Sequence, residues 1–172
     1  MSILKDDLAL FITAEDIKKM VLELAQKIEK DYADHEIIWV CPLRGSIHFV
    51  ADLMRNIRLP QQIEFVQMKT LLKGGTVQIL KDVGVSITNK HVLVAEEIID
   101  TGRALYYLMN HLELSRPASL KIVTLLDKPA RRELPLRADY VGRVIEDRFV
   151  VGYGMDSEEL GRNFKHIYYL KN

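Results

Sequence analysis

The sequence has 172 residues, of which 48% are hydrophobic and 28% are charged, and its 24 lysines and arginines balance its 24 aspartates and glutamates. This length suits one domain, 1–172, that buries roughly two thirds of its unfolded surface. The zero net charge gives no overall basic field that would draw the protein to nucleic acid or to an anionic membrane. No apolar run approaches the roughly 18 residues of a membrane span, and the acidic start MSILKDDLALF is unlike a signal peptide. We therefore expect a cytoplasmic protein.

Helices and strands are predicted to alternate in the first third of the chain. Thr13-Ala14-Glu15-Asp16 is typical of a capping box, and apolar residues at helical spacing from 17 to about 32 predict one helix with a packing role. Residues 37–41 predict a strand, and residues 47–54 predict the next helix. The single cysteine, Cys41, is therefore expected to be a buried strand residue and not a nucleophile.

The turn Arg44-Gly45-Ser46 joins that strand to the following helix. Its glycine allows a ligand to approach the backbone closely, and a helix start stabilises an anion by about 0.3–1 kcal/mol. The ordinary alternative is a simple turn with a serine N-cap. The residues alone leave both interpretations open.

Two further strands, 62–68 and 77–80, flank a polar loop at 69–76. Gly74-Gly75 in this loop is typical of a hairpin turn, so the two strands can form an antiparallel flap. No G-x-x-x-x-G-K-[ST] surrounds the glycines, which excludes a P-loop.

The most informative stretch is HVLVAEEIIDTGRALYY, residues 91–107. Residues 92–95 predict a buried parallel strand that brings Glu96 and Glu97 to its C-terminal end, where open α/β sheets bind ligands. The start of the next helix, at Thr101-Gly102-Arg103, suits a phosphate, whereas carboxylates suit sugar hydroxyls or water on a metal ion. A sugar phosphate would satisfy both halves. The alternative is a solvated acidic loop, and the two isoleucines before the DTG turn argue against it.

Two later segments carry residues whose role the pattern leaves open. Lys128 follows a strand predicted for residues 119–126, where the ordinary interpretation is a surface lysine with its stem along apolar surface. Phe149 lies beside two valines, where an aromatic side chain usually belongs to the core. A further strand is predicted to begin at Tyr140.

Four motifs, in family order, resemble those of the type I phosphoribosyltransferases. Residues 96–102, EEIIDTG, are most similar to the hypoxanthine-guanine members of that family, and the other three motifs are LRGS at 43–46, LDKP at 126–129 and the segment 148–156. The resemblance runs from about residue 12 to residue 168. It implies an α/β fold in which helices flank a central, mainly parallel twisted sheet that carries a small hood or flap.

The resemblance also implies an activity in purine salvage. That activity is Mg2+-dependent transfer of 5-phosphoribosyl from phosphoribosyl diphosphate (PRPP) to a 6-oxopurine, hypoxanthine and also guanine, giving IMP or GMP and pyrophosphate. A homodimer or homotetramer is the family expectation. Asp100 would be the catalytic base at purine N7. The metal would be held by Glu96, Glu97 and Asp156.

The resemblance also implies which residues would bind the purine base and which would bind PRPP. In the purine site Lys128 would donate to O6, Phe149 would stack on the ring, and Val150 and Asp156 would read its edge. The peptide before Arg44 would be cis. The residues implied for PRPP and its phosphates are Leu43, Arg44, Gly45, Glu96, Glu97, Ile99, Asp100, Thr101, Gly102, Arg103, Ala104 and Arg162.

Three positions depart from the family pattern. Thr70-Leu71 stands where the hood usually carries Ser-Tyr, in a loop that is several residues shorter; Glu97 replaces an Asp, and Ala104 replaces a second hydroxyl at the 5′-phosphate. Loss of that hydroxyl would cost about 0.5–1.5 kcal/mol of affinity unless Arg103 compensates. These departures motivate one alternative function, a non-catalytic regulator that binds PRPP or a nucleotide. The purine-site residues argue against it, because a PRPP sensor does not need them.

Overall fold

A computed structural model describes residues 8–70 and 77–171 of the chain. The protein contains a large sheet of six strands in the order β4-β3-β2-β5-β6-β7, and a small sheet in the order β1-β9-β8. The large sheet is built from β2 (Ile37–Leu43), β3 (Gln61–Thr70), β4 (Val77–Lys81), β5 (His91–Ile99), β6 (Ser119–Asp127) and β7 (Tyr140–Val144). The small sheet is built from β1 (Leu8–Ile12), β8 (Val150–Val151) and β9 (Ile167–Leu170).

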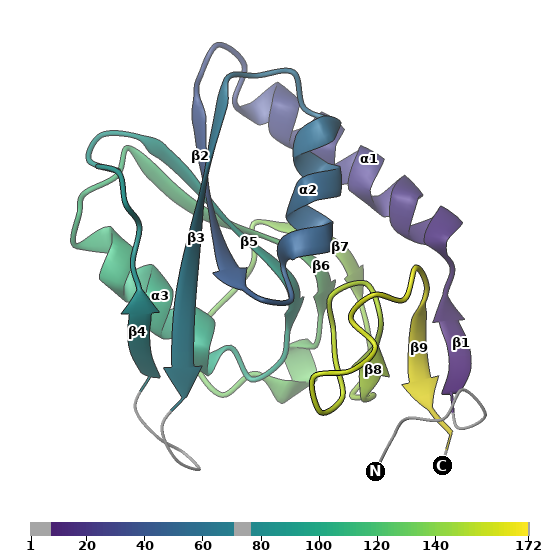
Figure 1. The fold of residues 1–172 in the computed structure, drawn as a ribbon. Coiled ribbons are helices and arrows are strands. Elements are labelled where there is room, and N and C mark those ends of the chain that lie inside the picture. Colours follow the sequence, from purple (N-terminus) through teal and green to yellow (C-terminus); the bar gives the residue numbers. More distant parts are fainter. Residues whose placement is uncertain (1–7, 71–76, 172) are drawn as a thin grey trace.

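Helices cover both faces of the large sheet (Figure 1). On one face, α1 (Ala14–Asp31) and α2 (Ile47–Arg55) share an apolar cluster with β2, and on the other face α3 (Arg103–Glu113) packs in a second cluster. Because the central strands are covered on both sides, β2 is apolar along its whole length, and even Trp39 is fully buried. The expected α/β fold, with a mainly parallel sheet between helices, is confirmed.

Several local predictions are also confirmed. Thr13 and Asp16 form the capping box at the start of α1, with the Asp16 amide donating to the Thr13 hydroxyl at 3.1 Å. Cys41 is fully buried, and burial raises the pKa of its thiol above the usual range, which disfavours a nucleophilic thiolate. The strands β3 and β4 pair antiparallel, as expected for the flap, whereas Leu71, Gly74 and Gly75 lie outside the described residues.

The strand before the DTG turn is longer than predicted. We expected it to end near Ala95, but β5 continues to Ile99, because its parallel pairing with β6 extends to Ile99 and Asp127. Glu96 and Glu97 therefore lie inside the strand and not in a loop. The interpretation as a solvated acidic loop is wrong.

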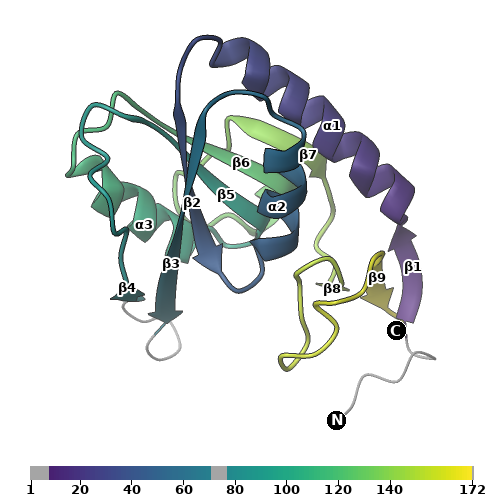
Figure 2. The same ribbon diagram turned by 45° about the horizontal axis from the view of Figure 1, so that its top comes forward.

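The segment that joins β8 to β9 returns to the large sheet. Figures 1 and 2 both show it, in yellow-green, beside the C-terminal end of β2. A Cβ atom added to Gly154, whose φ is +100°, would lie 2.0 Å from the carbonyl oxygen of Gly45. The small sheet thus places a late part of the chain against the turn that follows β2. No helix in the described ranges 8–70 and 77–171 is long and apolar enough to cross a membrane.

Candidate active site

A small pocket of about 160 Å³ lies at the C-terminal ends of β5 and β6. Its lining includes the four residues predicted to bind a purine, although they come from two distant motifs. Lys128 in this pocket is only 6% exposed, so the interpretation as a surface lysine is wrong. Phe149 is 53% exposed, so it is not a core aromatic and its ring is free to cover a ligand. The lining residues are Glu97, Ile98, Asp100, Lys128, Phe149, Val150, Met155 and Asp156.

A second pocket, of about 170 Å³, lies on the other side of Asp100. It is formed by the DTG turn and the first turn of α3, together with Glu96. Gly102 begins that helix with a φ of +79°, a conformation that favours glycine. The first N–H groups of a helix suit an anion. The lining residues are Glu96, Ile98, Ile99, Asp100, Thr101, Gly102, Arg103, Ala104 and Leu105.

The turn after β2 is packed tightly against the acidic part of β5. A Cβ atom added to Gly45 would lie 1.6 Å from Oε1 of Glu97, so the position accepts only glycine while Glu97 keeps its place. The Leu43–Arg44 peptide is cis, as the resemblance implied. Ser46 is fully buried and donates to the carbonyl of Pro42 at 2.6 Å. Ser46 does occupy the N-cap position of α2, as the ordinary alternative expected, but its side chain makes no capping bond to the helix.

Two arginines converge on one carboxylate oxygen beside this turn. Arg44 Nη1 lies 2.7 Å from Glu159 Oε2, and Arg162 Nη2 lies 3.3 Å from the same atom. Arg162 is also held by Asp156, at 2.8 Å, and by the Gly154 carbonyl, at 2.8 Å. Two guanidinium groups around one oxygen are suited to a phosphate or pyrophosphate group. Both arginines were predicted from the sequence, whereas Glu159 was not.

Glu97 is buried and Glu96 is partly buried, and each has a carboxylate oxygen without a partner among residues 8–70 and 77–171. The Oε2 atom of each is buried and has no hydrogen-bond partner in the described part of the chain. Burial raises the pKa of Glu96, and the charge of Glu97 raises it further. For Glu97 burial again dominates and raises the pKa to about 7, although Arg162 lowers it. Buried carboxylates with unused oxygens favour a cation.

The three predicted metal ligands do not form one cluster. Glu96 lines the pocket beside the DTG turn, whereas Glu97 and Asp156 line the pocket at Lys128. No group of three or more His, Cys, Asp or Glu side chains within 8–70 and 77–171 is arranged to hold a metal ion. A magnesium ion here would need further oxygen ligands from the substrate and from water, which is its usual mode of binding.

Asp100 lies between the two pockets and is ion-paired. Its Oδ1 accepts a hydrogen bond from Arg131 Nε at 2.9 Å, and its backbone carbonyl accepts one from Arg132 Nη1. Arg132 also pairs with Asp127. Sequence reasoning missed both arginines, although a basic pair one residue after the LDKP motif was a usable signal.

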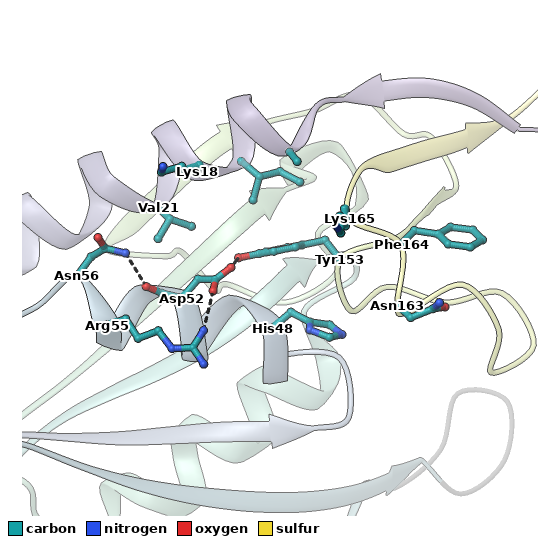
Figure 3. A pocket seen from close by; sticks show the side chains of 12 residues that line it. Lys18, Val21, His48, Asp52, Arg55, Asn56, Tyr153, Asn163, Phe164 and Lys165 are labelled. Atoms are coloured by element: carbon teal, nitrogen blue, oxygen red, sulfur yellow. Dashed lines mark hydrogen bonds and ion pairs between the residues drawn. The ribbon is translucent and has the colours of Figure 1, made fainter.

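A wider groove of about 490 Å³ lies elsewhere, between α1, α2 and the segment before β9 (Figure 3). It contains none of the predicted site residues. On one side of this groove the Tyr153 hydroxyl donates to Asp52 Oδ2 at 2.7 Å, and His48 lies near the Tyr153 ring. The groove has more volume but lacks the strand-end carboxylates, so we place the candidate active site in the two small pockets.

A parallel sheet with an anion-binding turn and buried carboxylates at its strand ends is typical of α/β proteins that bind phosphorylated ligands. Comparison with known proteins gives the family. Residues 12–158 match the phosphoribosyl transferase domain model. The chain belongs to the phosphoribosyltransferase family.

The relatives are similar over nearly their full length. A hypoxanthine-guanine phosphoribosyltransferase of Staphylococcus epidermidis is 43% identical over 171 residues, which cover 97% of this chain and 96% of that protein. The crystal structure of a hypoxanthine phosphoribosyltransferase from Staphylococcus aureus has a TM-score of 0.94 and 42% identity, with 99% and 95% of the two chains covered. A hypoxanthine-guanine phosphoribosyltransferase from Bacillus anthracis, with HEPES in the active site, has a TM-score of 0.91, 42% identity and coverages of 95% and 97%.

Proposed function

We propose that this single domain, 1–172, transfers 5-phosphoribosyl from PRPP to N9 of a 6-oxopurine, hypoxanthine and also guanine. The observation that carries the proposal is the position of Asp100, which lines both the pocket with Lys128 and Phe149 and the pocket with the DTG turn. A base bound in the first pocket and a phosphoribosyl group in the second would meet beside this carboxylate. Relatives that carry this activity in their names support the same assignment.

In this proposal the two pockets hold the two halves of the nucleotide. Thr101, Gly102 and Arg103 hold the 5′-phosphate with backbone N–H groups and one hydroxyl, and Ile99 and Ala104 complete the pocket wall. Lys128 donates to the purine O6 atom, which disfavours adenine because adenine carries an amine at that position. Phe149 covers the ring face, and the backbone of Val150 reads its edge.

The turn after β2 binds the pyrophosphate leaving group in this proposal. Arg44 and Arg162 receive its charge, and the cis peptide at Leu43 with the bare backbone of Gly45 lets it approach closely. Cleavage at the anomeric carbon develops positive charge on the ribose, so the site must hold both reactants in line and stabilise the departing anion. Asp100 accepts or shares the proton at purine N7.

We also propose that Mg2+ binds here. Of the three predicted ligands, Glu97 and Asp156 line the same pocket and would contact it, and Glu96, in the neighbouring pocket, would act through water or substrate. The unpartnered buried oxygens of both glutamates support this assignment. The metal would neutralise pyrophosphate charge. Glu96 and Glu97 would then hold the ribose hydroxyls, either directly or through water.

The quaternary state and the cellular location are part of the same proposal. We propose that the protein is a homodimer or a homotetramer and that it is cytoplasmic. We propose no nucleic acid or membrane partner, because the net charge of zero gives no overall attraction to polyanions. Light scattering on the purified protein measures its mass directly. A monomer at micromolar concentration would contradict the oligomer.

The test is nucleotide formation by purified protein with Mg2+ and PRPP, run in parallel with hypoxanthine, guanine, xanthine and adenine. We expect turnover with hypoxanthine and guanine and none with adenine. Asp100→Asn should lower kcat about 100-fold or more, the usual size of a proton-transfer contribution, with PRPP affinity unchanged. Absence of turnover with PRPP still bound by calorimetry would favour the regulator instead.

A further inference from the structure

The Asp100 carboxylate needs something to fix its direction. It lies in the turn after β5, its side chain is 46% exposed, and it faces two pockets at once. A half-exposed aspartate in a turn can adopt several rotamers, and only some of them aim an oxygen at a bound purine. Small misplacements of a reacting group cost large factors in rate.

Arg131 supplies the contact to this carboxylate. Its Nε donates to Oδ1 of Asp100 at 2.9 Å, and its Nη1 lies 3.6 Å from Asp147 Oδ2. The hydrogen bond to Asp100 is also the largest cause of a raised pKa of Arg131. The hydrogen bond from Arg131 uses Oδ1 of Asp100, which leaves Oδ2 for a ligand.

The backbone of Arg131 is tied to the same sheet edge as Asp100. Arg131 ends the short 3-10 helix Pro129–Arg131, where its N–H donates to the Lys128 carbonyl at 3.0 Å. The Lys128 N–H in turn donates to the carbonyl of Ile99 at 3.0 Å. The next residues continue the connection, because Glu133 N–H donates to the Thr101 carbonyl at 3.1 Å. Arg131 and Asp100 therefore keep a fixed relation to each other and to Lys128.

Asp147 extends this connection to the other wall of the purine pocket. It lies two positions before Phe149, in the loop that leads into β8. Arg131 thus lies between the carboxylate of the proposed base and the loop that carries the proposed stacking residue. An exposed ion pair contributes little to the free energy of unfolding. Stability of the fold therefore does not account for the ion pairs that Arg131 makes with Asp100 and Asp147.

We propose that Arg131 is a positioning residue that holds Oδ1 of Asp100, so that Oδ2 points at the purine. The proposal rests on the proposed role of Asp100 in proton transfer. Arg131 acts through Asp100 and does not itself contact PRPP or the base.

The test is a double-mutant cycle between Arg131→Ala and Asp100→Asn, read as kcat with saturating PRPP and hypoxanthine. We expect Arg131→Ala to lower kcat about tenfold in the wild-type background, with KM for PRPP unchanged, and to have no effect beyond about twofold in the Asp100→Asn background. Arg131→Lys should recover part of the rate. Arg137→Ala, at an exposed arginine of the same connection, is the matched control and should leave kcat unchanged.

Each outcome separates this inference from the proposed function. Equal losses of kcat from Arg131→Ala in both backgrounds would overturn the positioning role, because Arg131 would then act without Asp100. An unchanged kcat for Arg131→Ala would overturn it as well, even if Asp100→Asn is slow. A normal rate for Asp100→Asn would instead overturn the proposed role of Asp100. The thermal unfolding midpoint of the Arg131→Ala variant should match that of the wild type. If the alanine variant does not fold, Arg131→Gln takes its place in the double-mutant cycle.

Discussion

The Cα of Gly45 faces the carboxylate of Glu97 so closely that a single added methyl group would lie 1.6 Å from Oε1. The turn after β2 and the acidic part of β5 therefore form one packed unit, in which a change at either residue displaces the other. Gly154 packs against the same turn, because its own added Cβ would lie 2.0 Å from the Gly45 carbonyl oxygen.

Gly45→Ala should therefore reduce PRPP affinity about tenfold or more, which is about 1.4 kcal/mol, because the alanine displaces Glu97 or the turn. Calorimetric titration with PRPP and Mg2+ measures the loss. Gly84→Ala is the matched control, since its Cβ would lie 3.5 Å from the nearest atom, which is ordinary contact. Equal affinities for the two variants would show that the turn can relax at no cost.

Glu97 should make stability depend on pH. Its pKa is raised from 4.5 to about 7, first by burial, while Arg162 lowers it and Asp156 raises it. Because the pKa is higher in the folded protein, the native state binds more protons than the unfolded chain at any pH between the two pKa values. The free energy of unfolding therefore falls as the pH rises from about 4.5 to about 7. The loss is at most about 3 kcal/mol.

Urea denaturation at several pH values measures this effect, and Glu97→Gln is the comparison. The glutamine variant cannot ionise at this position, so its stability should fall less over the same pH range. Parallel curves for the two proteins would show that Glu97 is not the titrating group. Saturating Mg2+ should flatten the wild-type curve near pH 7, because a bound cation stabilises the ionised carboxylate.

Lys128→Ala should weaken purine use and leave PRPP binding intact. A hydrogen bond from a charged donor contributes about 1.5–3 kcal/mol, so kcat/KM for hypoxanthine should fall by about 10- to 100-fold. The ratio of rates with hypoxanthine and adenine measures the specificity. A retained preference over adenine would show that another group reads O6.

Glu159→Gln should tighten the binding of pyrophosphate. The Glu159 carboxylate now neutralises Arg44 and Arg162 in the place where the proposed ligand would bind. Exposed ion pairs contribute about 0–1 kcal/mol, so the gain should be at most about fivefold in Kd. Glu23→Gln, an exposed glutamate of α1, controls for net charge. Weaker binding by the Glu159 variant would show instead that this carboxylate holds the arginines in position.

Tyr153→Phe should destabilise the fold without changing purine specificity. Burial and the hydrogen bond to Asp52 raise the pKa of Tyr153 above the usual range, so the phenol stays protonated and donates. Removal of this donor should cost about 1–3 kcal/mol of unfolding free energy, measured in urea. Tyr107→Phe, at a tyrosine that is 42% exposed, should cost much less.

Sequence patterns predicted the elements whose cause is local. The capping box at Thr13, the buried strand around Trp39 and the helix after the DTG turn follow from short-range spacing, and all three are present. The end of β5 could not be predicted in this way, because pairing with β6 extends it through two glutamates that disfavour a strand.

The contacts that sequence reasoning missed are all made between distant segments. Glu159 meets Arg44 only because the chain returns past β2, and Arg131 meets Asp100 only because β5 and β6 are neighbours. The four motifs predicted which residues gather at the strand ends. They could not show that Glu96 and Glu97 line different pockets, since that depends on how the end of β5 packs against the rest of the fold.

The pairing of β1 with β9 brings together residues about 160 positions apart, from Leu8 with Leu170 to Ile12 with Ile167. During synthesis on the ribosome β1 must therefore remain without its partner until β9 has emerged. The segment with Asp156 and Arg162 lies between β8 and β9, so it docks only when this long-range contact closes. The pyrophosphate end of the proposed site is thus expected to form only after β9 has been made and has paired with β1 and β8.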